Sequence, residues 1–439
     1  MTDNNIFRNS TALFHTFGCK LNFAETSTVA RTFAEAGIRR VQQGDIPDFV
    51  VVNTCSVTEV ADKKCRQAIR SFHRKYPDAA IVVTGCYAQL KPETVADLPG
   101  VVIVAGVDKK DRLLDFLTEY VQNRHSVSSV IDSRNIDNFI PACERGDRTR
   151  YFLKVQDGCD YWCSYCTIPK ARGRSRSGTV AQIVAQAREA AAQGGKEIVI
   201  TGVNIGDFGR RNGETFFDLV RALDKVEGIE RYRISSIEPN LLTDEIIDYC
   251  ADSQRFMPHF HIPLQCGSDT VLRLMRRRYD TALFASKIQR IKERMPHAFI
   301  GVDVIVGARG ESDECFEESL ELCRRLPLSR LHVFVYSERP GTRALDLDGK
   351  VPAEVQQRRT HRMLTLSEEK MRQFYTEHLG TVRPALLEHS APGHPLSGFT
   401  DNYIRILVDA PATLDNTIVN VRLDAIDSDG EHVLATLVP

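Results

Sequence analysis

Three cysteines stand close together in the stretch DGCDYWCSYC of this 439-residue chain. Cys159, Cys163 and Cys166 have the spacing C-x3-C-x2-C. A structural zinc site uses four protein ligands, so three thiolates indicate either a distant fourth ligand or a metal position left open for another molecule. Zinc, a thiol redox pair and an iron–sulfur cluster are the alternatives, and thiolates are the usual ligands of iron–sulfur clusters.

Three further cysteines occupy equivalent places near the N-terminus. Cys19 follows the apolar segment TALFHTFG, Cys55 follows DFVVVNT and Cys86 follows AAIVVTG. Each lies just beyond a predicted parallel strand, and in open α/β sheets the carboxyl ends of the strands form the crevice where ligands bind. The convergence predicts a second site with three thiolates rather than three unrelated buried cysteines. The other six cysteines show no such pattern and are predicted to be structural.

The elements that position these cysteines follow from the hydrophobic pattern. Residues 11–123 alternate short apolar strands with amphipathic helices, which predicts a doubly wound α/β domain. Helices are expected from about residue 22 and over 57–75, 87–98 and 108–121. Residues 124–144 are polar and lack a sustained period, so they are predicted to form a linker.

A second βα series runs through residues 145–375. Six strand–helix units are too few for a closed eight-unit barrel and predict a partial (β/α)6 barrel. A long helix is expected from Pro352 to about His378. Three strand-like segments then predict a small β-barrel within residues 376–439. The expected strands of the partial barrel are 151–156, 196–201, 232–237, 259–264, 298–306 and 331–336.

Composition narrows the class of protein. An apolar content of 42%, a charged content of 26% and a formal net charge of −1 are typical of an ordinary globular protein, so any basic site must be local. The N-terminus lacks the apolar region of a secretory signal, and no apolar run is long enough to span a membrane. We therefore expect a cytoplasmic protein without a membrane partner, in which twelve cysteines do not form a disulfide framework.

The segment CDYWCSYC resembles the signature of radical S-adenosylmethionine enzymes, including the aromatic Tyr165 before the last cysteine. Together with the three N-terminal cysteines and the terminal β-barrel, it makes nearly the whole chain similar to the methylthiotransferases, which combine an N-terminal methylthiotransferase domain, a radical core and a TRAM domain. The resemblance implies two 4Fe-4S clusters. It assigns Cys159, Cys163 and Cys166 to the cluster that binds S-adenosylmethionine, and Cys19, Cys55 and Cys86 to an auxiliary cluster.

The same resemblance suggests the cofactor contacts. The segments TGVN, SSIEP and HIPLQ end successive predicted strands and face the expected cleft. Two departures from the family pattern stand nearby: Cys266 replaces a common serine, and Ala308-Arg309 replaces a Phe-Pro pair. The implied contacts with S-adenosylmethionine are Tyr165, Gly202, Asn204, Glu238 and Gln265.

The implied reaction uses two molecules of S-adenosylmethionine. One donates a methyl group to sulfur at the auxiliary cluster, and the other is cleaved by one electron to a 5′-deoxyadenosyl radical. The product carries C–SCH3 in place of C–H. Cys159, Cys163, Cys166 and Cys55 are accordingly the residues expected to be catalytic. The electrons would come from a flavodoxin or ferredoxin system, whereas the sulfur donor stays open.

Members of this family act on adenosine 37 of transfer RNA or on an aspartate of a ribosomal protein. Residues 145–178 hold eight Lys/Arg against three Asp/Glu, and residues 270–294 hold eight against two, which favours a phosphate-rich partner. Residues 376–439 hold three Arg against nine Asp/Glu and favour a basic protein instead. The arginines predicted to bind substrate are Arg172, Arg174, Arg176, Arg276, Arg277 and Arg278.

The motifs RSRS, SSIEP and MRRRY most resemble the branch that acts on N6-threonylcarbamoyladenosine in the anticodon loop. That nucleoside carries a carboxylate, which arginines bind well. An enzyme for isopentenyladenosine would offer an apolar pocket instead. The prediction is therefore methylthiolation at C2 of threonylcarbamoyladenosine 37; isopentenyladenosine, a ribosomal protein and a non-enzymatic iron–sulfur electron carrier are the alternatives.

Overall fold

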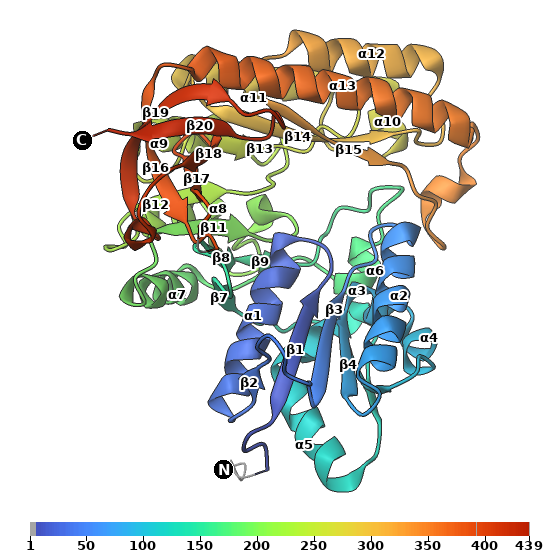
Figure 1. Ribbon diagram of the computed structural model, residues 1–439. Coiled ribbons are helices and arrows are strands. Elements are labelled where there is room, and N and C mark those ends of the chain that lie inside the picture. Colours follow the sequence, from blue (N-terminus) through green and yellow to red (C-terminus); the bar gives the residue numbers. More distant parts are fainter. Residues whose placement is uncertain (1–5, 392, 439) are drawn as a thin grey trace.

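The computed structural model describes residues 6–391 and 393–438, and its N-terminal unit is a parallel sheet of six strands in the order β2-β1-β3-β4-β5-β6. Figure 1 shows this unit in blue to turquoise, below the rest of the molecule. β3 and β4 are fully buried because helices cover both faces of the sheet. The strands are β1 (Thr11–Thr16), β2 (Arg39–Arg40), β3 (Phe49–Thr54), β4 (Ala80–Gly85), β5 (Val101–Ala105) and β6 (Val127–Ser129).

Two hydrophobic layers hold this sheet. α1 (Lys20–Glu35) and α5 (Leu113–Asn123) pack on one face, and α2 (Glu59–Lys75) packs with two short helices on the other. The doubly wound prediction is thereby confirmed. The expected helix over 87–98 is instead split into α3 (Cys86–Leu90) and α4 (Pro92–Ala96), because Pro92 has no N–H group to continue the first helix.

The segment 124–144 is not a plain linker. Its beginning adds β6 to the edge of the N-terminal sheet, and its end forms β7 (Ala142–Glu144), which pairs antiparallel with the first strand of the next unit. Short edge strands of this kind are held by main-chain hydrogen bonds, so the side-chain pattern of a polar sequence does not predict them. The segment therefore joins the two units by pairing with both.

The central unit is the predicted partial barrel of six parallel strands. It consists of two sheets, which backbone bridges from Tyr232 to Phe256 and from Ser236 to His261 join. Outward side chains form the largest hydrophobic core with the surrounding helices, and inward ones line a concave face. The strands are β8 (Tyr151–Lys154), β11 (Glu197–Thr201), β12 (Arg231–Ile234), β13 (His259–His261), β14 (Phe299–Val306) and β15 (Arg330–Val335).

Seven helices and one pair of short antiparallel strands complete the central unit. β9 (Gln156–Asp157) pairs with β10 (Arg176–Ser177) on either side of the segment that carries Cys159, Cys163 and Cys166. The helices are α6 (Ile168–Arg172), α7 (Val180–Ala192), α8 (Phe216–Leu223), α9 (Asp244–Asp252), α10 (Asp269–Leu274), α11 (Thr281–Arg294) and α12 (Asp313–Arg325).

The chain ends in the predicted small barrel. α13 (Ala353–His378) crosses the central unit beside α12 and leads into a closed barrel in the order β16-β17-β18-β20-β19 (Figure 1). Arg233 of β12 donates to the carbonyls of Thr400 and Asp401, so the barrel is docked on the central unit. Its strands are β16 (Val382–Glu388), β17 (Leu396–Thr400), β18 (Arg405–Val408), β19 (Ile418–Ile426) and β20 (Val433–Leu437). No helix among the described residues could cross a membrane.

Candidate active site between the N-terminal and central units

The N-terminal cysteines follow three neighbouring strands. β1, β3 and β4 lie side by side, and Cys19, Cys55 and Cys86 come within three residues of their carboxyl ends. Gly18 brings the first loop against the second: it has φ +97°, and a Cβ added there would lie 2.9 Å from Cβ of Cys55. The structure thus brings these three cysteines to one edge of the sheet, as their sequence positions suggest.

The thiols differ in burial. Cys19 is exposed, whereas Cys55 and Cys86 are buried. Burial raises the pKa of Cys55 to about 12 and also raises the pKa of Cys86, although Arg172 and Lys110 act against the latter shift. Without a cation these thiols stay protonated near neutral pH, whereas a bound metal ion stabilises the thiolate. All twelve cysteines are free, so three converging thiols fit a metal cluster.

The second set of cysteines lies in the loop after β9. Main-chain N–H groups of Tyr161 and Ile168 donate to Sγ of Cys159 and Cys166 at 3.3 and 3.4 Å. Arg277 Nη1 donates to Sγ of Cys163 at 3.1 Å. Hydrogen bonds to sulfur stabilise a thiolate and tune the potential of a metal cluster held by it. The donors therefore fit three metal ligands.

Residues next in sequence to the two sets contact each other. Thr167, which follows Cys166, donates from Oγ1 to the carbonyl oxygen of Ser56, which follows Cys55, at 3.4 Å. Arg339 donates to Oγ of Ser56 at 2.7 Å. The N-terminal and central units therefore meet where the loops of Cys55 and Cys166 lie.

The loop predicted to contact S-adenosylmethionine is tied to β9. The N–H groups of Val203 and Asn204 donate to Oε1 of Gln156 at 3.0 and 2.7 Å. A Cβ at Gly202 would lie 2.9 Å from the Gln156 carbonyl oxygen, so only glycine allows this approach. Oδ1 of Asn204 is buried without a partner among the described residues, which fits a polar ligand in this cleft.

Glu238 and Arg277 form the charged side of the same cleft. The two side chains pair, and Arg277 also reaches the hydroxyls of Tyr279 at 3.2 Å and Tyr165 at 3.5 Å. Burial raises the pKa of Glu238, and the Arg277 guanidinium opposes that shift. Arg277, predicted to bind substrate, is thus placed among the predicted cofactor residues. Gln265 ends the cleft with φ +63°, a backbone conformation that non-glycine residues seldom adopt.

The six predicted substrate arginines do not form one surface. Arg172 and Arg176 are buried and engaged by carboxylates, so the structure gives them a structural setting instead of the open basic face expected. Arg174, Arg276 and Arg278 are exposed. The guanidinium of Arg278 lies 3.9 Å from the ring centre of Tyr161, inside the cysteine loop. The basic surface near the site is therefore smaller than the charge count suggests.

The buried arginines belong to an ion cluster that sequence reasoning missed. Glu25 of α1 lies 2.7 Å from Nζ of Lys154 and accepts from both Nη atoms of Arg172 at 3.1 Å, and its partners lower its pKa strongly although burial would raise it. Each side chain is at most 4% exposed. No periodicity could have found a cluster whose members are 129 and 147 residues apart. This buried ion cluster consists of Glu25, Lys110, Lys154, Asp157, Arg172 and Arg176.

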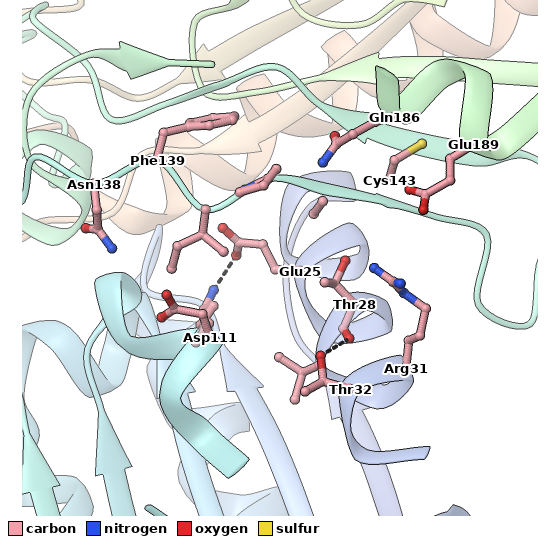
Figure 2. A pocket seen from close by; sticks show the side chains of 15 residues that line it. Glu25, Thr28, Arg31, Thr32, Asp111, Asn138, Phe139, Cys143, Gln186 and Glu189 are labelled. Carbon is pink, nitrogen blue, oxygen red and sulfur yellow. Dashed lines mark hydrogen bonds and ion pairs between the residues drawn. The ribbon is translucent and has the colours of Figure 1, made fainter. Parts of the chain in front are cut away.

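A cavity of about 350 Å³ flanks the buried ion cluster. Figure 2 shows Glu25 and Asp111 on one side of it and Cys143, Gln186 and Glu189 on the other. It contains none of the six converging cysteines, so we do not assign the reaction to it.

The two departures from the family pattern, Cys266 and Ala308-Arg309, do not contact the converging cysteines. Cys266 is fully buried in the hydrophobic core of the central unit. Arg309 pairs with Glu338 at 2.7 Å and donates to the carbonyl oxygens of Leu345 and Leu347. Arg309 therefore closes a loop, and its charge is paired with that of Glu338.

Comparison with known proteins agrees with this architecture. Residues 11–106 match the family described as "Uncharacterized protein family UPF0004", and residues 153–323 match the radical SAM superfamily. The structure of the radical S-adenosylmethionine methyltransferase TsrM from Kitasatospora setae superposes with a TM-score of 0.55 at 14% identity, covering 74% of this chain and 73% of the other, which is a likeness of fold alone.

Sequence relatives are much closer. The threonylcarbamoyladenosine tRNA methylthiotransferases MtaB of Bacillus subtilis and Aquifex aeolicus are 38% and 36% identical, covering 94% and 90% of this chain and 94% and 95% of theirs. A tRNA-2-methylthio-N(6)-dimethylallyladenosine synthase of Syntrophotalea carbinolica is 32% identical over 86% of this chain and 88% of its own. The radical SAM match implies S-adenosylmethionine and a 4Fe-4S cluster. The chain belongs to the methylthiotransferase family of radical S-adenosylmethionine enzymes.

Proposed function

We propose that this enzyme adds a methylthio group to C2 of N6-threonylcarbamoyladenosine at position 37 of transfer RNA, with two 4Fe-4S clusters and two molecules of S-adenosylmethionine per turnover. The observation that carries the proposal is the contact between Thr167 and Ser56, which brings the loop of Cys55 beside the loop of Cys166. The radical and the sulfur must both react at the same carbon atom of the substrate. Two separate cysteine sites can serve that reaction only if both face one bound substrate.

When bound, the clusters and S-adenosylmethionine would supply one-electron cleavage and methylated sulfur. The protein's own residues orient these groups: Cys159, Cys163 and Cys166 would hold the first cluster, and Cys19, Cys55 and Cys86 the auxiliary one. The Gly202–Asn204 loop, Tyr165, Glu238 and Gln265 would hold the methionine and ribose parts of the cofactor. The Arg277 guanidinium, between Glu238 and Sγ of Cys163, fixes the acidic side of that pocket.

The choice of transfer RNA rests on the relatives and on local charge. The MtaB relatives are named for threonylcarbamoyladenosine, and Arg174, Arg276 and Arg278 stay exposed for phosphate contacts. A dimethylallyladenosine substrate is the second candidate, because relatives of that name match at 32–34% identity. We place the reaction in the cytoplasm, with electrons from a flavodoxin or ferredoxin system.

Mass spectrometry tests the substrate. Nucleosides of bulk transfer RNA and the ribosomal proteins would be compared in cells with and without this enzyme. Loss of methylthio-threonylcarbamoyladenosine alone is expected. Loss of the dimethylallyl product or of a ribosomal-protein modification would replace the proposed substrate.

Two cysteine variants test which set of cysteines serves cleavage of S-adenosylmethionine and which serves sulfur insertion. Cys163→Ala is expected to abolish cleavage of S-adenosylmethionine, whereas Cys55→Ala should retain some cleavage and lose sulfur insertion. Cys323→Ala, a buried cysteine on α12, is the control and should keep both. A normal methylthio product from Cys55→Ala would contradict the auxiliary cluster.

A further inference from the structure

The concave face of the central unit carries a polar group that the proposed reaction has not used. Three inward side chains sit on neighbouring strands: His261 on β13, Asp303 on β14 and His332 on β15. Nε2 of His261 lies 2.8 Å from Oδ1 of Asp303, and the two imidazole rings are 5.0 Å apart. Phe334, two residues beyond His332 on the same face, is 48% exposed. The side chains of His261 and Asp303 are 20% and 19% exposed.

Lys20 is the first residue of α1, a helix that packs against β8 of the barrel. Lys20, Phe23 and Ala24 share one side of the helix. The ring of Phe23 lies 5.3 Å from that of Phe152, and Ala24 packs with Phe152 and Val199, whose side chains point into the barrel. The helix face that carries Lys20 therefore covers the concave side.

The positive charge of Lys20 affects the pKa values of two of these side chains, His332 and Asp303. Burial lowers the pKa of His332 to about 4, with His261 and more weakly Lys20 acting in the same direction. Lys20 also helps to lower the pKa of Asp303, after the larger effect of its bond to His261. Lys20 directly follows Cys19 in the chain, at the end of α1 that begins beside the converging cysteines.

Lys20 differs from the other cations of this face in having no partner. Arg233 lies 2.7 Å from Glu197 and Arg150 lies 2.8 Å from Glu388. Among residues 6–391 and 393–438, Lys20 forms no salt bridge and no side-chain hydrogen bond, and the nearby Asp303 is occupied by His261. An unpaired ammonium group inside a concave site fits an anionic ligand.

We propose that Lys20 binds the carboxylate of the threonylcarbamoyl group and selects that nucleoside against the uncharged dimethylallyl one. The proposal rests on the proposed function and names its specificity residue. A carboxylate held by Lys20 places the base beside Cys19, and Phe334 offers an aromatic face for stacking. A dimethylallyl group would cover the ammonium without pairing it, which costs binding free energy.

Binding of anticodon stem-loops tests this assignment. The iron-loaded full-length enzyme would be titrated with three loops that differ only at position 37: adenosine, threonylcarbamoyladenosine and dimethylallyladenosine. Lys20→Met should weaken binding of the threonylcarbamoyl loop by about 10- to 100-fold, the range expected for a hydrogen bond to a charged group. Binding of the adenosine loop should not change, and Lys20→Arg should retain most of the preference.

Lys225→Met is the matched control, since Lys225 is exposed and away from the cleft. Equal weakening of all three loops by Lys20→Met would make Lys20 a general phosphate contact, and unchanged binding would remove it from the site; either result overturns the proposal. If Lys20→Met lowers the iron content, Lys20→Gln and Lys20→Arg are compared at equal iron, and the proposal then requires only the arginine variant to keep the preference.

The test separates this inference from the proposed function. If the wild-type enzyme forms no methylthio-threonylcarbamoyladenosine, the proposed function fails. If it forms that product and Lys20→Met still prefers the threonylcarbamoyl loop, only the role of Lys20 fails.

Discussion

Removing one charge from the buried ion cluster should destabilise the joint between the N-terminal and central units. Glu25 on α1 is the only carboxylate of the cluster that the N-terminal unit contributes; it meets Lys154 and Arg172 of the central unit and Lys110 of its own. Glu25→Gln keeps the shape of the side chain and deletes its charge. One carboxylate, Asp157, would then remain for four buried cations.

The magnitude follows from burial. Breaking a buried ion pair by removing one partner typically costs about 3–5 kcal/mol, because the other charge stays buried and unpaired. Glu25 is 2% exposed and serves three cations, so we expect a loss in that range. Glu230→Gln is the control: its pair with Lys196 has a similar N···O distance of 2.7 Å but side chains 50% and 38% exposed, and exposed pairs contribute about 0–1 kcal/mol.

Urea unfolding of the full-length protein measures the difference. Circular dichroism reports secondary structure, and hydrogen exchange at α1 and α6 reports the joint itself. Glu25→Gln should lower the unfolding free energy far more than Glu230→Gln and should raise exchange at both helices. A loss below about 1 kcal/mol for Glu25→Gln would refute the reasoning, since it would mean that the cluster is solvated like a surface pair.

Three further predictions follow from the same geometry. The cationic partners of Glu25 and Asp157 lower the pKa values of both carboxyl groups in the folded protein. The two carboxylates therefore stabilise the fold above their unfolded-state pKa values of about 4, and this stabilisation is lost as the pH falls through their folded-state pKa values. The free energy of unfolding of Glu25→Gln should therefore depend less on pH in the acid range. Gly85→Ala, with φ +100° and a Cβ only 2.4 Å from the Thr54 carbonyl oxygen, should lower stability by at least about 2 kcal/mol and reduce bound iron, whereas Gly380→Ala, also at positive φ but in open space, should keep its iron. Arg277→Lys keeps the charge but loses the fork that joins Glu238 to Cys163, so cleavage of S-adenosylmethionine should slow about 10-fold; an unchanged rate would remove Arg277 from the pocket.

Much of the architecture could be predicted because its signals are local. The hydrophobic periods of a strand and of the helix after it can be recognised within ten or twenty residues. A cysteine just past such a strand must lie at the carboxyl edge of the sheet. Cys19, Cys55 and Cys86 could therefore be grouped from their positions in the sequence alone. The linker was misjudged because β6 and β7 have only three residues each and depend on neighbouring strands.

Charge was the least predictable property. The count of eight basic residues in 145–178 treated all of them as surface, whereas Arg172 and Arg176 are buried against Glu25 and Asp157. A side chain's charge is visible in the sequence, but its partner is not when that partner lies on another domain. The same reason hid Lys20, whose interest comes from having no partner among the described residues while facing the barrel.

The sequence by itself determined the grouping of the cysteines, the order of the three units and the family, because each depends on motifs and strand–helix periods that are local in the chain. Only the tertiary structure decided how the N-terminal and central units meet, which arginines are exposed and which cation has no partner among the described residues. Those properties arise from packing between segments more than one hundred residues apart, such as Glu25 on Arg172 and Ser56 on Thr167. Long-range pairing of charges is set by the fold as a whole and by the desolvation it imposes.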